Sequence, residues 1–442
     1  MGLSTQSILK RSAALCGALA VSTAAAAANW PQWRGPEFNG STSEKGLPSQ
    51  FSKTENVVWT AVLPGPSAST PVVWGDTLFV TTADKNAREL RAMALDRKTG
   101  KERWSKKVID GYSRDERSNF ASPSPATDGE RVVFFFGNGE MVCFGLQGEE
   151  YWRRNLQADY GDFAFQWTFS SSPVISGGKI YQQVLQRNQP VHGKGKPGAE
   201  SFLLALDPQT GKTLWRHVRP SEAVAESLES FSTPMPWTYQ GRKELLITGG
   251  DCVSGHDPET GKELWRWGTW NPTKIGHWRL VPSPIAGAGV ILACAPKGSP
   301  IYAVKAGAHG AVPDSGLAWT SAEQRTLSSD VPTPAFYGGD FIILGDQRRS
   351  LSRVEPATGK IKWTLETPGR SKYEASPLAA DGKIYIMNFA SEVTVVDAEK
   401  GSILATVPMG DPGENESRAS IIAAHGKLFI RTLQKIYCVG QP

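Results

Sequence analysis

The sequence predicts an all-β protein, an eight-bladed β-propeller of four-stranded antiparallel blades whose ring is closed by an N-terminal strand. Two motifs carry this prediction, because a turn motif and a proline motif each recur along most of the 442 residues. Copies of the proline motif begin 43–61 residues apart, a period typical of radial blades built from four short strands. The composition is that of a globular protein, with 40% hydrophobic and 21% charged residues.

The turn motif consists of an apolar pair, an acidic residue, a short variable run, Gly, a polar residue and then Trp. Its clearest copy spans residues 205–215 and contains Asp207, Gly211 and Trp215. Asp followed by Gly between apolar runs predicts a hairpin, because Asp bonds its own turn amides and Gly adopts the left-handed conformation. A Trp one strand later can pack onto the next blade, with its indole N–H free to reach a carbonyl. We expect eight such contacts around the ring, with Ala405 in the eighth slot and tryptophans at Trp59, Trp104, Trp152, Trp215, Trp265, Trp319 and Trp363.

The proline motif is Ser/Thr-Pro followed by small and apolar residues, a Gly turn and a strand. Its eight copies place these residues at the same position: Pro71, Pro125, Pro173, Pro234, Pro284, Pro334, Pro377 and Ile421. Trp59 has no Asp-Gly turn before it, whereas the last copy has no Trp strand after it. We infer that residues 57–59 supply the outer strand of the last blade, which closes the ring and removes an open sheet edge.

Residues 1–28 have the layout of a cleavable secretory signal. Lys10 and Arg11 precede an apolar stretch that ends in a run of alanines, and we expect cleavage after Ala28. The stretch is shorter than the ~20 residues that span a bilayer, so a retained anchor is disfavoured. We therefore expect a periplasmic or secreted monomer without a transmembrane span.

Residues 29–56 form an N-terminal extension before the propeller at 57–442. The extension contains two tryptophans and little periodicity. We expect it to pack across a propeller face as a plug or strap, rather than to act as a flexible tether.

The four cysteines that follow the signal are Cys143, Cys252, Cys294 and Cys438. Cys143 and Cys438 fall in a repeat slot that alanine occupies in other blades, and this favours small, free, buried side chains. A disulfide between Cys252 and Cys294, in neighbouring blades, stays open at this point.

The repeats resemble the quinoprotein-type, or PQQ-like, β-propeller family, including its exported BamB-like members, over roughly residues 57–440. That resemblance implies one of two classes: enzymes that hold pyrroloquinoline quinone with a calcium ion, or non-catalytic propellers that bind proteins. Family dehydrogenases typically carry adjacent cysteines at the cofactor, and this chain has none. We expect a non-catalytic protein-binding or scaffolding module without cofactor, metal site or catalytic residues. The alternative is an oxidoreductase that uses pyrroloquinoline quinone with calcium.

The loops that enter each Ser/Thr-Pro strand differ between repeats and carry charged and aromatic residues. Propellers bind ligands at a mouth of the central channel, where such loops converge. Two interpretations stay open, a solvated rim of salt bridges or a contact surface for a protein, peptide or small molecule, of which we expect protein or peptide to be the partner. A net charge of +5 without a Lys/Arg run argues against nucleic acid. The candidate binding residues are Trp167, Glu229, Trp278, Arg279, Asp330, Tyr373, Glu374 and Arg418.

Overall fold

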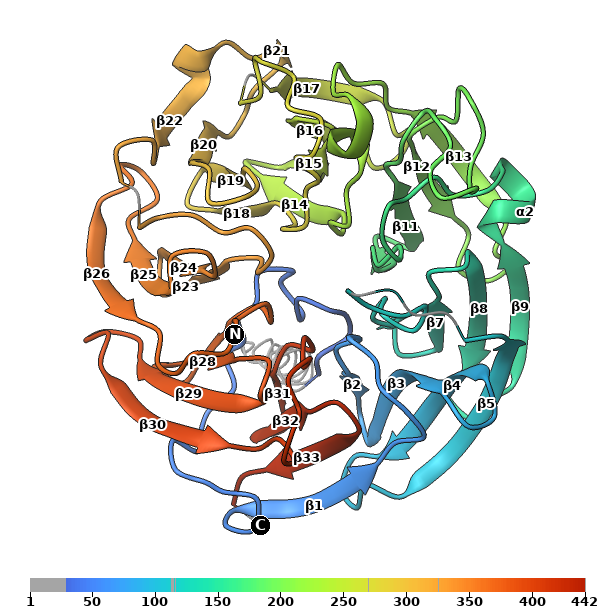
Figure 1. Cartoon of the computed structure of the whole chain (residues 1–442), viewed down its shortest axis with the longest axis vertical. Coiled ribbons are helices and arrows are strands. Elements are labelled where there is room, and N and C mark those ends of the chain that lie inside the picture. The colour runs from blue at the N-terminus through green and yellow to red at the C-terminus, as the bar shows by residue number, and fades with distance from the viewer. Residues whose placement is uncertain (1–28, 113–114, 116, 269, 325, 442) are drawn as a thin grey trace, which may run out of the picture.

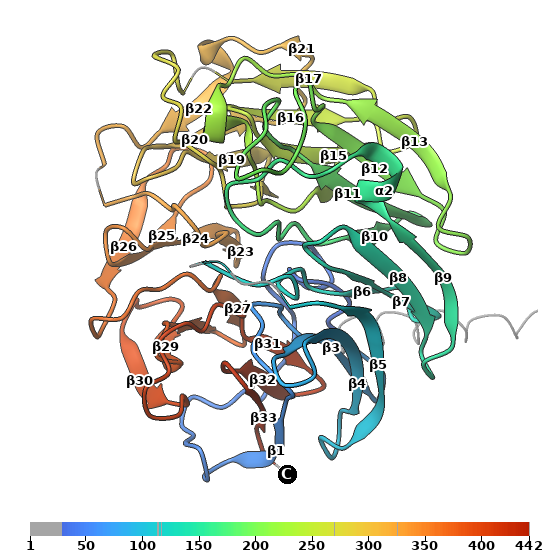
Figure 2. The same cartoon turned by 45° about the vertical axis from the view of Figure 1, so that its right-hand side comes forward.

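Eight sheets radiate from a central axis in the computed structural model, which describes residues 29–112, 115, 117–268, 270–324 and 326–441 (Figure 1). The four antiparallel strands of each blade are ordered from the centre to the rim, and the turned view shows the twist of the sheets on its right-hand side (Figure 2). The predicted all-β propeller with eight blades is confirmed. The predicted signal at residues 1–28 lies outside the described part of the chain. No helix in that part is long and apolar enough to cross a membrane.

The first four blades contain the strands between residues 72 and 267, and one short helix accompanies them. Their bounds are β2 (Val72–Trp74), β3 (Thr77–Asp84), β4 (Glu89–Asp96) and β5 (Glu102–Asp110) in blade 1; β6 (Ala126–Thr127), β7 (Arg131–Phe135), β8 (Glu140–Gly145) and β9 (Glu150–Asn155) in blade 2; β10 (Val174–Ser176), β11 (Lys179–Val184), β12 (Phe202–Leu206) and β13 (Thr213–Val218) in blade 3; and β14 (Met235–Tyr239), β15 (Arg242–Gly249), β16 (Cys252–His256) and β17 (Glu263–Trp267) in blade 4. Helix α2 (Leu156–Tyr160) follows blade 2, and a 3-10 turn (Ala225–Leu228) precedes blade 4.

The last four blades complete the ring. Their bounds are β18 (Ile285–Gly287), β19 (Val290–Cys294), β20 (Ile301–Lys305) and β22 (Leu317–Thr320) in blade 5; β23 (Ala335–Tyr337), β24 (Asp340–Gly345), β25 (Ser350–Val354) and β26 (Ile361–Glu366) in blade 6; β27 (Leu378–Ala380), β28 (Lys383–Met387), β29 (Glu392–Asp397) and β30 (Ile403–Pro408) in blade 7; and β31 (Ile422–Ala424), β32 (Lys427–Arg431), β33 (Lys435–Val439) and β1 (Val57–Val62) in blade 8. A 3-10 turn (Asp314–Gly316) leads into β22, and the two-residue strand β21 (Gly310–Ala311) pairs in parallel with β17 of blade 4.

Ring closure occurs as the sequence predicts. Strand β1 is the outer strand of blade 8 and pairs antiparallel with β33, with Trp59 opposite Cys438. The same pairing sets Trp104 opposite Ala94 and Trp152 opposite Cys143. The two cysteines therefore occupy the small-residue slot that the repeat alignment assigned to them.

Six of the seven slot tryptophans dock onto the next blade by donating the indole N–H to a backbone carbonyl of its outer turn. The donor–acceptor pairs are Trp59 to Arg97 (2.8 Å), Trp104 to Leu146 (3.0 Å), Trp152 to Pro208 (2.9 Å), Trp215 to Pro258 (3.1 Å), Trp319 to Pro356 (2.7 Å) and Trp363 to Ala398 (3.2 Å). Because each bond links neighbouring blades at the rim, the six tryptophans form a girdle around most of the ring.

The turn that receives each Trp has the chemistry that its sequence predicts. The Asp207 carboxylate accepts the backbone N–H groups of Gln209 and Thr210 at 2.9 and 2.8 Å. Gly211 has a φ of +67°, and a Cβ at this position would lie 2.6 Å from the Trp152 ring. Gly is therefore required both for the turn and for the close approach of the Trp.

Two junctions depart from the expected eight contacts. Trp265 of blade 4 donates its indole N–H to the Glu244 carboxylate of its own blade at 2.6 Å, and β21 covers the edge of that blade instead. At the junction of blades 7 and 8 the slot holds Ala405, which has no indole. The expectation of eight equivalent contacts is therefore wrong at these two places, because one receiving turn lacks the repeat and one slot lacks the ring.

Residues 29–56, called the strap from here on, pack against the propeller as expected. The strap runs along inner strands at the end of the channel away from the mouth loops, through backbone hydrogen bonds between Trp30 and Val73, Pro31 and Thr127, Asn39 and Phe336, and Gly40 and Ala379. Leu47 and Phe51 then join the shared apolar core of blades 7 and 8, at the junction that lacks a docked Trp. The strap thus links the inner strands of several blades and adds apolar packing at a junction without a docked Trp.

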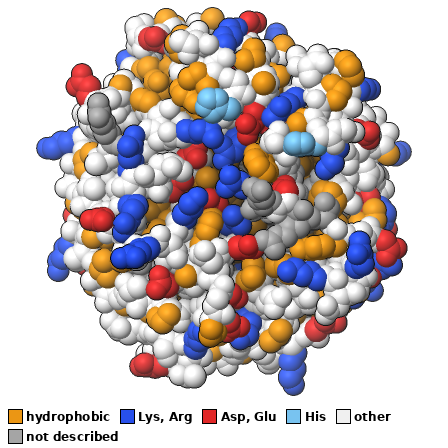
Figure 3. Space-filling view, viewed as in Figure 1, with side chains coloured by type: hydrophobic (Ala, Val, Ile, Leu, Met, Phe, Trp, Pro, Cys, Tyr) orange, Lys and Arg blue, Asp and Glu red, His pale blue; other side chains and the backbone are white. Residues whose placement is uncertain are grey.

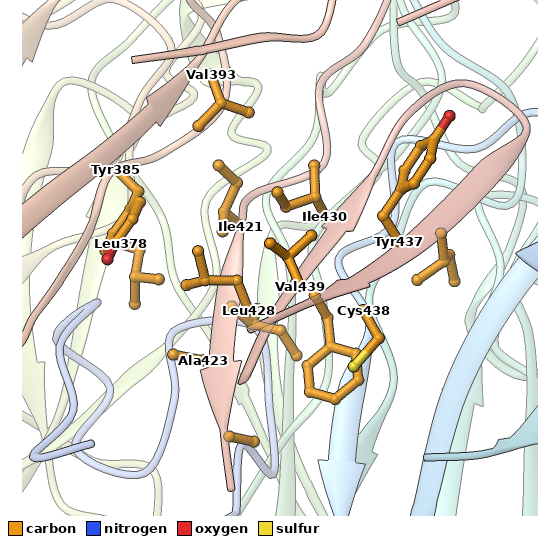
Figure 4. Close-up of a cluster of buried hydrophobic side chains, with 14 of the residues drawn as sticks. Leu378, Tyr385, Val393, Ile421, Ala423, Leu428, Ile430, Tyr437, Cys438 and Val439 are labelled. Atoms are coloured by element: carbon orange, nitrogen blue, oxygen red, sulfur yellow. The ribbon is translucent and has the colours of Figure 1, made fainter. Parts of the chain in front are cut away.

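The apolar core lies between neighbouring sheets rather than in one central mass. Between blades 7 and 8, side chains such as Leu378, Tyr385, Ile421 and Leu428 point toward one another and are fully buried (Figure 4). The four cysteines of the described chain are buried and free, so the open possibility of a Cys252–Cys294 disulfide is not realised.

Candidate functional site

The inner end of every blade contributes one hydroxyl to a closed hydrogen-bonded ring around the channel. This hydroxyl ring consists of the residue before each motif proline or its equivalent: Thr70, Ser124, Ser172, Thr233, Ser283, Thr333, Ser376 and Ser420. Each hydroxyl oxygen accepts the backbone N–H of its counterpart in the preceding blade, at 2.8–3.1 Å, and the last link runs from Ser420 back to Thr70. The Ser/Thr of the proline motif is therefore explained by a contact between blades.

The ring hydroxyls keep their own hydrogens available. Within the described residues, each of the eight accepts one backbone N–H and has no acceptor for its O–H. Hydroxyl rotors turn to suit a partner. Because these side chains are almost fully buried, an acceptor that enters the channel would meet several O–H donors at once.

Above the hydroxyl ring lies a cavity of about 170 Å³ that we call the mouth cup. Five ring hydroxyls line it, together with Trp33, Arg117, Trp167, Arg279, Glu374 and Arg418. Figure 3 views this face and shows Lys and Arg side chains gathered around a hollow at its centre. The described wall thus carries three arginines and one carboxylate.

The arginines of the cup are held in different ways. The Arg418 Nε donates to Glu374 at 2.9 Å, and its guanidinium lies 4.5 Å from the centre of the Phe389 ring. Arg279 Nε is 3.9 Å from the Glu226 carboxylate. The guanidinium of Arg117 stacks over the Trp167 ring at 5.1 Å and forms no ion pair with the described residues. Among the described residues, Arg418 is thus the one arginine of the cup that a carboxylate contacts within 3 Å.

The strap closes the bottom of the cup. Trp33 lines the cup, and the neighbouring Arg34 donates to the carbonyls of Pro334 and Pro377 at 2.8 and 3.2 Å. Burial lowers the pKa of Arg34 to about 9. Trp33 therefore forms the strap-side wall of the cup, and we call the cup blind at this end.

The structure brings four of the eight candidate residues together in the cup: Trp167, Arg279, Glu374 and Arg418. Trp167 also donates its indole N–H to Glu226 at 3.2 Å, and this contact places Glu226 between Trp167 and Arg279. These four residues come from four different interblade loops, which agrees with the expectation that divergent loops converge at the mouth.

The other four candidates lie off the cup and hold loops in place. Glu229 is fully buried, pairs with Arg187 and accepts the backbone N–H of Gln166. Burial raises the pKa of Glu229 to about 7, although the ion pair with Arg187 acts in the opposite direction. The charge or aromatic character of the four residues drew attention to their loops, but Glu229, Asp330 and Tyr373 are buried and Trp278 is half-buried.

The other three candidates that lie off the cup are Asp330, Tyr373 and Trp278. The carboxylate of Asp330 accepts the backbone N–H of Lys297 at 2.6 Å. Tyr373 is buried and donates its hydroxyl to the Pro368 carbonyl at 3.0 Å, whereas Trp278 is half-buried against the shared core of blades 4 and 5.

Sequence reasoning missed the hydroxyl ring, Arg117 and the floor residue Trp33. The ring was visible in principle, because Ser or Thr precedes every motif proline. Arg117 and Trp33 carry no repeat signal, since one stands in an interblade loop and the other in the strap.

The cup does not fit a calcium-bound quinone. A calcium ion takes six to eight oxygen ligands, typically several carboxylates. The described residues contain no group of three His, Cys, Asp or Glu side chains that could hold a metal ion. Among the described residues, Glu374 is the one carboxylate that lines the cup, and it is already bonded to Arg418.

Eight radial blades, Trp-docked Asp-Gly turns and a blind central cup define the class of the protein, a PQQ-like β-propeller. A family model described as outer membrane protein assembly factor BamB matches residues 42–191 and 301–439, and the chain belongs to that family. The family resemblance of the repeats is thereby confirmed.

Similar solved structures include a BamB protein and two dehydrogenases. BamB from Moraxella catarrhalis has a TM-score of 0.59 and 12% identity, covering 87% of this chain and 99% of that one. A europium-containing methanol dehydrogenase has a TM-score of 0.64 and 11% identity, covering 94% and 98%. Quinohemoprotein alcohol dehydrogenase from Comamonas testosteroni has a TM-score of 0.60 and 15% identity, covering 95% and 82%. These likenesses show the fold alone, and no curated protein gives a significant match.

Proposed function

We propose that this protein is an exported, non-catalytic propeller that binds a protein or peptide segment at the mouth cup and so acts as a binding or scaffolding module. One observation carries the proposal: loops that differ between blades converge on a blind cup with three arginines and an aromatic wall. Such a cup can grip a side chain or a chain end that enters through the mouth.

The chemistry of the cup supports binding over catalysis. Glu374 is paired with Arg418, and the nearby Glu226 accepts from Trp167, so neither carboxylate stands ready as a general base. The described cysteines are buried, and burial raises the pKa of the Cys143 and Cys294 thiols to about 12, which opposes thiolate formation. The exported location rests on the N-terminal sequence and is part of the proposal.

The alternative is a dehydrogenase that uses pyrroloquinoline quinone with calcium. Its support is the shared fold of the dehydrogenases, whereas the donor set of the cup opposes it. Fluorescence titration of residues 29–442 with the quinone and Ca²⁺ separates the two functions: we expect no saturable quenching, and saturable calcium-dependent quenching would favour the dehydrogenase.

Photo-crosslinking tests the binding proposal directly. A photoreactive residue replaces Val331, which lines the cup. The control places it at Lys360, which is exposed in the β25–β26 turn and does not line the cup. In an extract of exported proteins from the source organism, we expect specific adducts from position 331 and none in common with position 360. Identical adducts from both positions would contradict a binding site at the mouth.

A further inference from the structure

We propose that the mouth cup binds the carboxylate group of an acidic peptide segment. This inference rests on the proposed function and adds the chemistry of the partner. Four features of the cup point to the same ligand: its charge, its hydrogen-bond donors, its shape and its apolar upper wall.

The charge of the cup favours an anion. Arg117, Arg279 and Arg418 line it with a single carboxylate, Glu374, so the formal charge of its described wall is positive. Arg is the side chain best suited to a carboxylate, because its planar guanidinium forms two parallel N–H···O bonds. The Arg117 guanidinium rests on the Trp167 ring and forms no ion pair with the described residues, so among these residues no carboxylate competes for such a pair.

The donors below the arginines also favour an anion. Five members of the hydroxyl ring line the cup: Ser124, Ser172, Thr233, Ser376 and Ser420. Each of these hydroxyl oxygens accepts one backbone N–H. The O–H hydrogen has no acceptor among the described residues, so it can be donated to a ligand. A carboxylate is a pure acceptor with about four lone-pair sites, and it would satisfy several of these buried hydroxyls together.

The shape of the cup favours a side chain or a chain end over a threaded chain. Trp33 of the strap closes the floor, and the volume is about 170 Å³. An engineered protein cavity of roughly 150 Å³ accommodates benzene, so an Asp or Glu side chain fits here.

The upper wall favours a peptide over a bare inorganic anion. Phe231, Val281 and Val331 line the cup together with Trp167. These apolar surfaces can cover the methylene groups of a Glu side chain and its apolar neighbours.

The test compares two fluorescein-labelled peptides with amidated C-termini, Gly-Phe-Glu-Glu-Phe-Gly and Gly-Phe-Gln-Gln-Phe-Gly, by fluorescence anisotropy on residues 29–442. In physiological salt we expect the Glu peptide to bind at least about tenfold more tightly than the Gln peptide, because only the former carries carboxylates. A third peptide, the Gln sequence with a free C-terminal carboxylate, shows whether the cup also accepts a chain end.

Two sets of variants, one of charged residues and one of ring hydroxyls, test whether the peptide binds in the cup. Arg279→Met and Arg418→Met should each weaken the Glu peptide by about fivefold or more, whereas Lys360→Met, with the same change of charge, should not. Ser376→Ala should weaken it, while Ser283→Ala, which removes a ring hydroxyl that does not line the cup, should leave it unchanged. Ser376→Thr keeps the hydroxyl and should retain binding.

The inference is overturned if the Glu and Gln peptides bind equally, if neither binds, or if Lys360→Met weakens binding as much as Arg279→Met. It is also overturned if inorganic phosphate binds and the peptides do not. If position 331 gives specific crosslinks but the Glu peptide binds no more tightly than the Gln peptide, the inference is wrong and the proposed function stands. Calcium-dependent quinone binding that excludes the peptide would remove both.

Discussion

Strand β12 of blade 3 reads Phe-Leu-Leu-Ala-Leu, whereas the equivalent strand β16 of blade 4 reads Cys-Val-Ser-Gly-His. Both strands are completely buried. Blade 3 therefore packs apolar side chains between sheets, while blade 4 buries polar groups at the same backbone positions. The two blades show how one backbone repeat accepts two kinds of interior.

The polar interior of blade 4 is held by a chain of hydrogen bonds. Arg219, at the end of blade 3, donates to Ser254 at 2.9 Å. Ser254 bonds His256 Nε2 at 2.9 Å, and His256 Nδ1 donates to the Gly261 carbonyl at 2.9 Å. Because buried polar groups are costly only when they lack partners, such a connected chain can replace apolar packing. The two segments matched by the family model leave out residues 192–300, and this gap contains blade 4.

The largest expected effect is the loss of stability when the slot tryptophan of each blade is replaced. Trp265 is almost fully buried and bonds Glu244, whereas Trp215 is half-buried and bonds a backbone carbonyl. We expect Trp265→Ala to destabilise the fold by about 4–5 kcal/mol and Trp215→Ala by about 3 kcal/mol. Urea denaturation measures both. Equal costs would show that the Trp265–Glu244 contact adds nothing beyond rim docking.

The next effect tests whether the glycine beneath a docked Trp is needed for space as well as for the turn. Gly211→Ala should cost about 3 kcal/mol, because its Cβ would collide with Trp152 and its φ is +67°. Gly241 is a matched control, with a φ of +82° and nothing within 4 Å of a Cβ, and Gly241→Ala should cost about 1 kcal/mol. Equal losses in urea denaturation would mean that the ring moves aside freely.

His256 makes the stability of blade 4 depend on pH. Burial lowers its pKa from 6.5 to about 3, so between these values the unfolded chain binds a proton that the folded chain does not. The contribution to stability is present above pH 6.5 and is lost as the pH falls toward 3. His256→Gln should reduce the loss of stability between pH 7 and pH 4 by about 3 kcal/mol. His309→Gln, at an exposed histidine, should leave that loss unchanged in urea titrations at the two pH values.

The smallest effect is expected at the mouth. Arg279→Ala should change the stability by less than about 0.5 kcal/mol, because its nearest carboxylate is 3.9 Å away and partly exposed pairs contribute little. Thermal unfolding is the measurement. A loss comparable to that of Trp215→Ala would place Arg279 among the structural residues and count against a ligand-binding role.

The sequence predicted the mouth cup less completely than the closed ring of eight blades. Trp167, Arg279, Glu374 and Arg418 were found because they interrupt a repeat with charged or aromatic residues, and they meet in the cup. Glu229 interrupts the repeat in the same way, yet it is buried with Arg187. A side chain in a divergent loop can turn toward the channel or into the protein, and its residue type does not choose between them.

The sequence by itself determined the number of blades, the strand order and the closure by β1, because these follow from local periodicity and turn chemistry that repeat eight times. Only the tertiary structure decided where Trp33 and Arg34 of the strap would lie. The carbonyls that Arg34 bonds, for example, belong to residues 300 or more positions away in the sequence. It also decided that eight separate hydroxyls meet in one ring, because closing a circle is a property of the whole assembly of blades. The blind, donor-rich cup is the joint result of those two long-range events.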